Sequence, residues 1–282
     1  VMLESIVTDI PVGRDPAHVA LFHEKGLAYV TNSGSNSVSV VNIVSRRLVG
    51  SLPVGRNPHG IVASPKNRTV FVANMGSNDV SVIDADSMQV KATIALSQRP
   101  KHLALSPEGS RLYVAAEKEV VWAIDTSENK IVAEIAAEGS LGEIAVSPDG
   151  RYAYLASHDP GLLHFINTDS DSIETSIPAG MGTEGMSIAP DGDRAFVANK
   201  SDNTLAIVDL QGKRVVTRIT VGAGPSGVAL LRSEKAPPPE AGVKRLPRTG
   251  EASPPMASLL VVGTLLLGAG LALGWPTRAQ ES

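Results

Sequence analysis

The sequence has no cysteine and no excess of basic residues. Without cysteine the chain cannot form disulfides, thiolate metal sites, a cysteine nucleophile or the Cys-x-x-Cys-His attachment of haem. Its net charge of −4 offers no basic footprint, so we expect no nucleic-acid partner. The Gly-Lys-Ser/Thr phosphate loop, the Gly-x-Ser-x-Gly nucleophile elbow and the His-Glu-x-x-His metal pair are also missing. These absences remove the common sequence signatures of nucleotide-binding proteins, serine hydrolases and zinc proteases.

Turn-forming and strand-forming residues are abundant instead. The 282 residues include 26 Gly and 19 Pro among many Val, Ile and Ala. This composition predicts an all-β protein with many turns.

The sequence is an internal repeat. A phrase of the form apolar-x-Gly-x-x-Pro precedes an apolar segment, and equivalent apolar positions recur at intervals of 41 or 42 residues. The phrase occurs at Val12 to Pro16, at Val54 to Pro58 and, in altered form, at Leu96 to Pro100. The equivalent apolar positions are Ile10, Leu52, Ile94, Ile135, Ile177 and Ile219. Five full units are therefore present.

Each unit contains four short apolar segments separated by turns, which is the pattern of one propeller blade. We expect five four-stranded antiparallel blades over residues 10–219, each with an aromatic residue at an equivalent place in one strand. These residues are Tyr29, Phe71, Tyr113, Tyr154 and Phe196. An Asn or Asp should close the last hairpin of each blade through an Asx turn. These residues are Asn42, Asp84, Asp125, Asn167 and Asp209.

The segment Tyr29-Val30-Thr31-Asn32, with Phe71-Val72-Ala73-Asn74 and Phe196-Val197-Ala198-Asn199, resembles the YVTN-repeat β-propeller family of microbial surface proteins. The resemblance covers residues 1–232 and implies about seven blades. Residues 1–10 are interpreted as the last strand of an incomplete blade and Pro225 to Leu231 as the first strand of another. We therefore expect part of a larger propeller, with a complete five- or six-bladed ring as the alternative.

The C-terminal region is organised differently. Residues 233–255 form a Pro-rich stalk, residues 256–275 carry no charge, and residues 276–282 form a short tail. Twenty uncharged residues can span a bilayer as one helix of about 30 Å. The sequence therefore predicts a transmembrane helix over 256–275.

The stalk contains Leu246, Pro247, Arg248, Thr249 and Gly250 ahead of the uncharged segment. This order resembles the sorting signal of Gram-positive surface proteins. The resemblance implies that a sortase-type transpeptidase cleaves after Thr249 and links the protein to peptidoglycan outside the cell. A plain membrane anchor is the alternative, because the tail has a single basic residue, Arg278. Residues 1–10 show no signal peptide, so we expect the chain to lack its N-terminal leader.

The candidate binding residues lie where each unit enters its first strand, which faces the channel in propellers. They are His18, His59, Lys101, His102, Glu143 and Glu184. Histidines and carboxylates could hold Zn²⁺ or Cu²⁺. His59, however, is displaced by one position from His18 and His102. We therefore expect solvated groups that do not converge, with no metal and no cofactor. We interpret His23, His158 and His164 as surface or packing residues.

No set of residues is assigned as catalytic. The sequence favours a non-enzymatic surface module that presents its loops to a protein or glycan, or a purely structural surface component. The alternative is a lactonase-like enzyme that uses the His and Glu residues at the channel mouth, and this requires the groups to converge.

Overall fold

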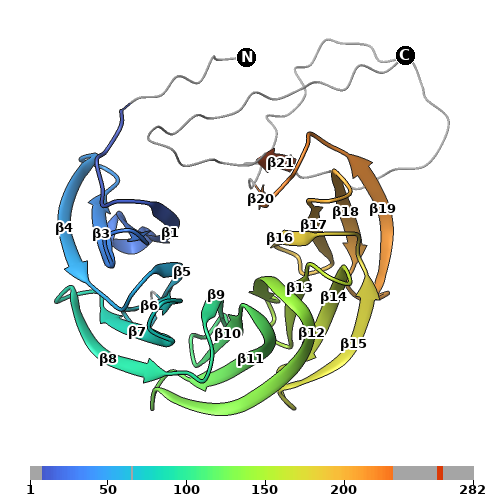
Figure 1. The fold of residues 1–282 in the computed structure, drawn as a ribbon, viewed down its shortest axis with the longest axis horizontal. Coiled ribbons are helices and arrows are strands. Elements are labelled where there is room, and N and C mark those ends of the chain that lie inside the picture. The colour runs from blue at the N-terminus through green and yellow to red at the C-terminus, as the bar shows by residue number, and fades with distance from the viewer. Residues whose placement is uncertain (1–7, 65, 231–258, 263–282) are drawn as a thin grey trace, which may run out of the picture.

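The computed structural model describes residues 8–64, 66–230 and 259–262. Within these residues, five antiparallel β-sheet blades surround a central space (Figure 1), and each blade follows chain order from an inner to an outer strand. Blades 1 and 2 contain β1 (Pro16–Phe22), β2 (Leu27–Asn32), β3 (Ser37–Asn42), β4 (Arg47–Pro53), β5 (Pro58–Ser64), β6 (Thr69–Asn74), β7 (Asp79–Asp84) and β8 (Gln89–Ala95). Blades 3 and 4 contain β9 (Pro100–Leu105), β10 (Arg111–Ala116), β11 (Lys118–Asp125), β12 (Lys130–Val146), β13 (Tyr152–Ser157), β14 (Leu162–Asn167) and β15 (Ser172–Pro178). Blade 5 contains β16 (Thr183–Ile188), β17 (Arg194–Asn199), β18 (Thr204–Asp209) and β19 (Arg214–Thr220).

The propeller architecture is thus confirmed, and three of the five predicted blades form separate four-stranded sheets, whereas blades 3 and 4 do not. Strand β12 runs through residues 130–146, so that it is both the outer strand of blade 3 and the inner strand of blade 4. We had expected each unit to form its own sheet, but these two blades share one seven-stranded sheet. Gly139 lies within β12 at φ +88°, a conformation that favours glycine, and it allows the strand to continue from one blade into the next.

The predicted equivalence of the aromatic positions is also confirmed. Tyr29 pairs with Ala20 on its inner neighbour, and the other four aromatic residues pair with residues at the matching places: Val62 with Phe71, Ala104 with Tyr113, Ala145 with Tyr154, and Ser187 with Phe196. Four of the five aromatic side chains are buried, whereas Phe196 in blade 5 is half-buried.

The hydrophobic core lies between blades. Tyr29 of blade 1 packs with Val70 and Val72 of blade 2 in one buried cluster. Tyr113 of blade 3 likewise packs with Leu141 and Leu155 of blade 4. Each blade therefore buries one face against its neighbour, and the sheets are apolar on both faces because both are covered.

A recurring pair, a glycine and a buried asparagine, positions the segment that leads into the first strand of blades 1, 2 and 5. Buried Asn32 lies so close to Gly13 that a Cβ on the glycine would meet the Asn32 Cγ at 2.6 Å. Its Nδ2 donates to the hydroxyls of Ser37 and Ser39 and so links β2 to β3. The same pairing joins Gly55 to Asn74 and Gly180 to Asn199. Blade 3, which has Ser97 and Ala116 at these positions, lacks both members of the pair.

The expected Asx turns are present. The Asn42 Oδ1 accepts from the backbone N–H groups of Val44 and Ser45, and Asn167 does the same for Asp169 and Ser170. Asp84, Asp125 and Asp209 make equivalent bonds. The polar segment after Asn167 is therefore a turn, as predicted, and the Tyr113 hydroxyl donates to the Asp171 Oδ1 within it at 2.8 Å.

Beyond blade 5, β20 (Gly227–Leu230) lies beside β16 as a further inner strand and pairs with β21 (Leu259–Val262). Residues 259–262 belong to the segment predicted to be a transmembrane helix, and they form a strand instead. Within the described ranges, no helix is both long and apolar enough to cross a membrane. The remainder of 256–275 and the motif at 246–250 lie outside the described residues.

Candidate functional site at the channel mouth

The inner strands β1, β5, β9, β12 and β16 lie side by side around the channel. Each of them contains a β-bulge at the same place, where three residues on the inner strand span the interval of two on its partner. In blade 1, for example, Pro16 pairs with Asn32 and Val19 pairs with Val30, so Ala17 and His18 lie within the bulge. A bulge redirects side chains that strict alternation would send to opposite faces.

Both bulged positions can therefore supply a side chain to the channel. His18 is the second of the two unpaired residues in its bulge and His59 is the first, whereas His102 pairs with Ala115 directly after the unpaired Lys101. The one-position displacement of His59, which had predicted that the three side chains would not converge, is compensated by this backbone feature. That expectation was wrong, because the bulge is invisible in a count of residues.

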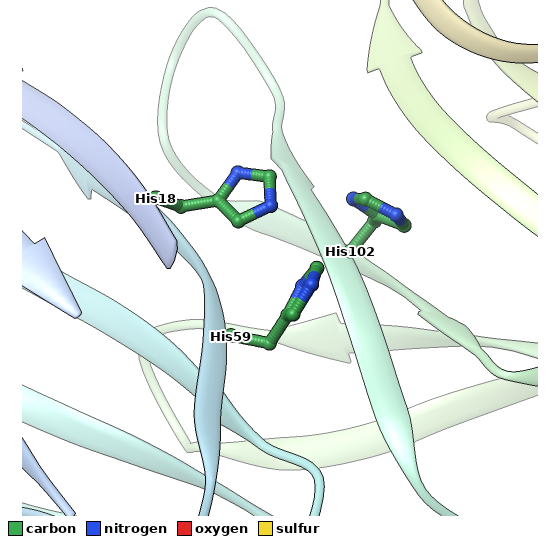
Figure 2. A group of neighbouring side chains, drawn as sticks. All are labelled: His18, His59 and His102. Atoms are coloured by element: carbon green, nitrogen blue, oxygen red, sulfur yellow. The ribbon is translucent and has the colours of Figure 1, made fainter. Parts of the chain in front are cut away.

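The three histidines lie together at the mouth (Figure 2). The ring centroids of His18 and His59 are 4.5 Å apart, and that of His102 lies 5.6 Å from His18 and 5.4 Å from His59. One ring nitrogen from each residue can be chosen so that all three lie within 4.8 Å of one another. Imidazole nitrogens in this arrangement could hold a metal ion.

Burial keeps these rings neutral. Burial and, to a smaller extent, the neighbouring His18 and Lys101 together lower the pKa of His59 to about 4, against a hydrogen bond to the Lys101 backbone that raises it. Burial also lowers the pKa of His18 and, more strongly, that of His102, with Lys101 adding to both effects. The Nε2 atom of His102 is buried and has no hydrogen-bond partner.

Thr31 joins the strands that carry two of these histidines. Its buried hydroxyl accepts from the backbone N–H of His18 at 3.0 Å and donates to the backbone carbonyl of His59 at 2.8 Å. The other blades have Ala at the equivalent position. Thr31 belongs to the segment that resembles the YVTN motif, and here it fixes the spacing of β1 and β5 at the mouth.

Carboxylates occupy the other side of the opening. The Glu143 Oε2 on β12 accepts from the backbone N–H of Met186 on β16 at 2.7 Å, so one oxygen is anchored across a blade boundary. Burial raises the pKa of Glu143 to about 7, with a smaller contribution from the charge of Glu184 and an opposing one from the Met186 bond. Glu184 itself pairs with Lys200 at 3.1 Å.

Lys101 and His158 also contribute to the electrostatics of the channel mouth. Burial lowers the pKa of Lys101, while Glu184 and Glu117 partly restore it. His158, which we had interpreted as a surface or packing residue in a loop, interacts with Lys101 and Glu184, and its Nε2 is buried with no hydrogen-bond partner. Sequence reasoning missed this residue because it follows a second strand of its blade and not a first one.

The two other histidines are placed as predicted. His23 lies in the 3₁₀ turn η1 (His23–Lys25), and buried His164 lies on β14 with its Nδ1 2.7 Å from the hydroxyl of Ser176. The mouth thus combines neutral imidazoles, one carboxyl group that titrates near pH 7, and one lysine. These groups can bind a polar ligand and exchange protons with it.

Comparison with solved structures supports the architecture. The hydrazine synthase of Kuenenia stuttgartiensis is similar, with a TM-score of 0.60 and 18% sequence identity over 82% of this chain and 92% of that chain. At this identity the likeness shows the fold alone. No curated protein matches the chain.

A model of a protein family gives a more specific result. The model is described as a lactonase with a seven-bladed β-propeller, and it matches residues 3–220. This match overturns the expectation that the protein is not an enzyme, because the model that it matches describes a family of lactonases, which are hydrolytic enzymes. The matched region spans all five described blades and every residue of the channel mouth. The chain belongs to the lactonase family of seven-bladed β-propellers.

Proposed function

We propose that the protein hydrolyses a lactone, a cyclic ester, at the mouth of its central channel. One observation supports this most directly: in a chain of the lactonase family, the inner strands bring a partly buried carboxyl group, a lysine and neutral imidazoles to one opening. The lactonase-like alternative from the sequence is thereby favoured over an adhesion module without catalytic activity.

Glu143 is the proposed general base. Its Oε2 is held by the Met186 N–H, and its Oε1 is free to accept a proton from water. The resulting hydroxide oxygen bonds to the carbonyl carbon of the lactone, the ring C–O bond breaks, and the Glu143 carboxylic acid returns the proton to the alkoxide that leaves. The products are one hydroxy acid and a regenerated carboxylate. A base with a pKa of about 7 suits both proton transfers near neutral pH.

Lys101 is the proposed electrostatic partner. It lies on β9, which packs against β12, and its positive charge acts on the neutral histidines. A cation at this place stabilises the negative oxygen that develops on the carbonyl as water adds. It also favours binding of the carboxylate product or of an anionic substituent on the substrate.

The test is a titration of the acid released from γ- and δ-lactones of simple hydroxy acids and of sugar acids. We expect kcat/KM to rise with pH about a midpoint near 7, and the Glu143→Gln variant to lose at least about 100-fold. Glu128→Gln, at an exposed hairpin paired with Lys130, is the matched control and should equal the wild type. Hydrolysis by Glu143→Gln at the wild-type rate would remove Glu143 from the reaction. No hydrolysis of any lactone by the wild type would overturn the proposal.

We further propose that the propeller acts at the cell surface of a Gram-positive bacterium. This part rests on the resemblance of residues 246–250 to the motif of a sorting signal. If a sortase processes the chain, mass spectrometry of wall fragments should find Thr249 joined to peptidoglycan, and Thr249→Ala should abolish that product. A chain intact through Ser282 in detergent extracts, with no wall-linked form, would favour the plain membrane anchor.

A further inference from the structure

We propose that His18, His59 and His102 form a binding site for a divalent transition metal ion of the zinc or copper class. This proposal does not depend on the hydrolase activity, because it concerns the affinity of the protein for the ion alone. It replaces our expectation from the sequence that the channel holds no metal.

The positions of the ligand atoms come first. Three successive blades each supply one imidazole, and the chosen nitrogens lie within 4.8 Å of one another. Nitrogens in a tetrahedral zinc site with bonds of about 2.1 Å lie about 3.4 Å apart. The ligand nitrogens must therefore approach by up to about 1.4 Å, the difference between 4.8 Å and about 3.4 Å, through rotation of the side chains. The rings of His59 and His102 meet at 88° and those of His18 and His102 at 80°, so none of the three pairs is stacked in a way that would block this approach.

The hydrogen bonds around the cluster leave ligand nitrogens available. The His59 Nδ1 lies 3.3 Å from the backbone oxygen of Lys101, and a carbonyl can only accept, so Nδ1 carries the proton and Nε2 carries the lone pair. Ligating histidines in metal sites typically donate their other N–H to a backbone carbonyl in this way. The buried Nε2 of His102, which has no partner, is a second nitrogen whose lone pair a metal ion would satisfy.

The donor types select the class of ion. The cluster consists of imidazoles alone, without a carboxylate among its three members. Neutral imidazole suits Zn²⁺ and Cu²⁺, whereas Ca²⁺ and Mg²⁺ require oxygen ligands. Three protein ligands leave a fourth coordination position, which is the arrangement of sites that bind an exchangeable water or ligand.

One neighbouring charge opposes the ion. Lys101 lies directly before His102 on β9, and its charge lowers the pKa of all three histidines. Glu184 and Glu117 lie near enough to Lys101 to raise its pKa and so favour its charged form. Repulsion between Lys101 and the metal ion should therefore weaken binding, and this gives the proposal a second, opposite prediction.

The experiment measures binding of Zn²⁺ to the full chain, produced without a histidine tag and stripped with a chelator. Competition against a chromophoric chelator gives stoichiometry and affinity, and Co²⁺ substitution reports geometry through its visible spectrum. We expect one equivalent of Zn²⁺ and a tetrahedral Co²⁺ spectrum. His59→Gln and His102→Gln should each weaken binding by at least about 100-fold, since each removes one of three ligands.

Two matched variants make the result specific. His23→Gln removes an exposed histidine outside the cluster and should leave stoichiometry and affinity unchanged. Lys101→Met should tighten binding by about 3- to 10-fold, which a misfolded protein would not do. Circular dichroism verifies the fold of each variant. The proposal fails if the Zn²⁺ affinity of the wild type is no higher than that of His59→Gln. It also fails if His59→Gln and His102→Gln both still bind one equivalent of Zn²⁺.

Discussion

The two sides of the channel mouth share one backbone and differ in chemistry. On the histidine side, β1, β5 and β9 present His18, His59 and His102. On the carboxylate side, β12 and β16 present Glu143 and Glu184. All five strands carry the same bulge at the same place. The repeat therefore fixes the positions from which side chains reach the channel. The types of the two residues at each bulge determine whether the mouth presents imidazoles or carboxylates.

The largest effect is expected when a glycine in one of these bulges is replaced by alanine. A Cβ on Gly60 would meet the backbone oxygen of Lys101 at 2.5 Å, so β5 and β9 would have to separate. We expect Gly60→Ala to lower the free energy of unfolding by about 3 kcal/mol. Gly142→Ala is the matched change on the carboxylate side, where the nearest atom lies at 3.0 Å, and it should cost about 1 kcal/mol. Urea unfolding measures both, and equal losses would contradict the close approach of β5 and β9.

A second prediction concerns the carboxylate side and the dependence of stability on pH. The pKa of Glu143 in the folded protein, about 7, lies above its ordinary value of 4.5, so folding favours the protonated form. The stability that the carboxyl group contributes is full below about pH 4.5 and is lost as pH rises through 7. Glu143→Gln imitates the protonated form at every pH. We expect it to match the wild type at pH 4 and to be more stable by about 3 kcal/mol at pH 8.

Thermal or urea unfolding at both pH values tests this expectation. Glu128→Gln, at an exposed hairpin outside the channel, is the control for the Glu-to-Gln substitution itself. A Glu143→Gln variant that is destabilised at pH 8 would mean that the carboxylate, and not the carboxylic acid, is the form that the mouth stabilises.

A third change tests the histidine side without touching a histidine. Thr31→Val keeps the shape of the side chain but removes the hydroxyl that joins the backbones of His18 and His59. We expect a loss of about 1 kcal/mol in unfolding free energy and about 10-fold weaker Zn²⁺ binding. Thr31→Ser keeps the hydroxyl and loses only a methyl group, so it is the matched control and should retain the Zn²⁺ affinity of the wild type. Wild-type Zn²⁺ affinity in Thr31→Val would show that the strand spacing does not depend on this hydroxyl.

The smallest effect is expected at the rim. Lys200→Met breaks the ion pair with Glu184, but half of the Lys200 side chain is exposed. Such pairs contribute about 0.5 kcal/mol, and salt screens them. The loss should therefore vanish in high salt, and a loss that persists there would indicate packing by the lysine stem.

Much of the fold could be predicted from the sequence because it repeats. The 41- or 42-residue interval placed Tyr29 and Phe71 in equivalent strands, and Asn42 closes its hairpin through local hydrogen bonds that depend on residue type alone. The continuity of β12 could not be predicted, because it depends on the backbone hydrogen bonds that flank Gly139. The seven-stranded sheet arises from backbone pairing between strands, which the residue types do not determine.

The site was predictable in membership but not in geometry. His18, His59 and His102 were identified from their place in the repeat, yet their convergence depends on the bulge. One signal in the sequence could have indicated it. In four units a small residue accompanies the polar one at the two bulged positions, and the order is interchangeable between units: Ala17 with His18, His59 with Gly60, Gly142 with Glu143, and Glu184 with Gly185. This exchange indicates that either position can face the channel.

The shared strand β12 also has a mechanical consequence. Blades 1, 2 and 5 are separate sheets, whereas β12 joins blades 3 and 4 through its own backbone. Residues 130–140 of β12 pair with β11 and residues 141–146 pair with β13, so no residue of β12 pairs with both neighbours. A bend between Ser140 and Leu141 would therefore tilt blade 4 against blade 3 without breaking the strand pairing of either blade. His102 on β9 and Glu143 on β12 lie on opposite sides of this point, and the amide hydrogens of the two blades should exchange as two separate units.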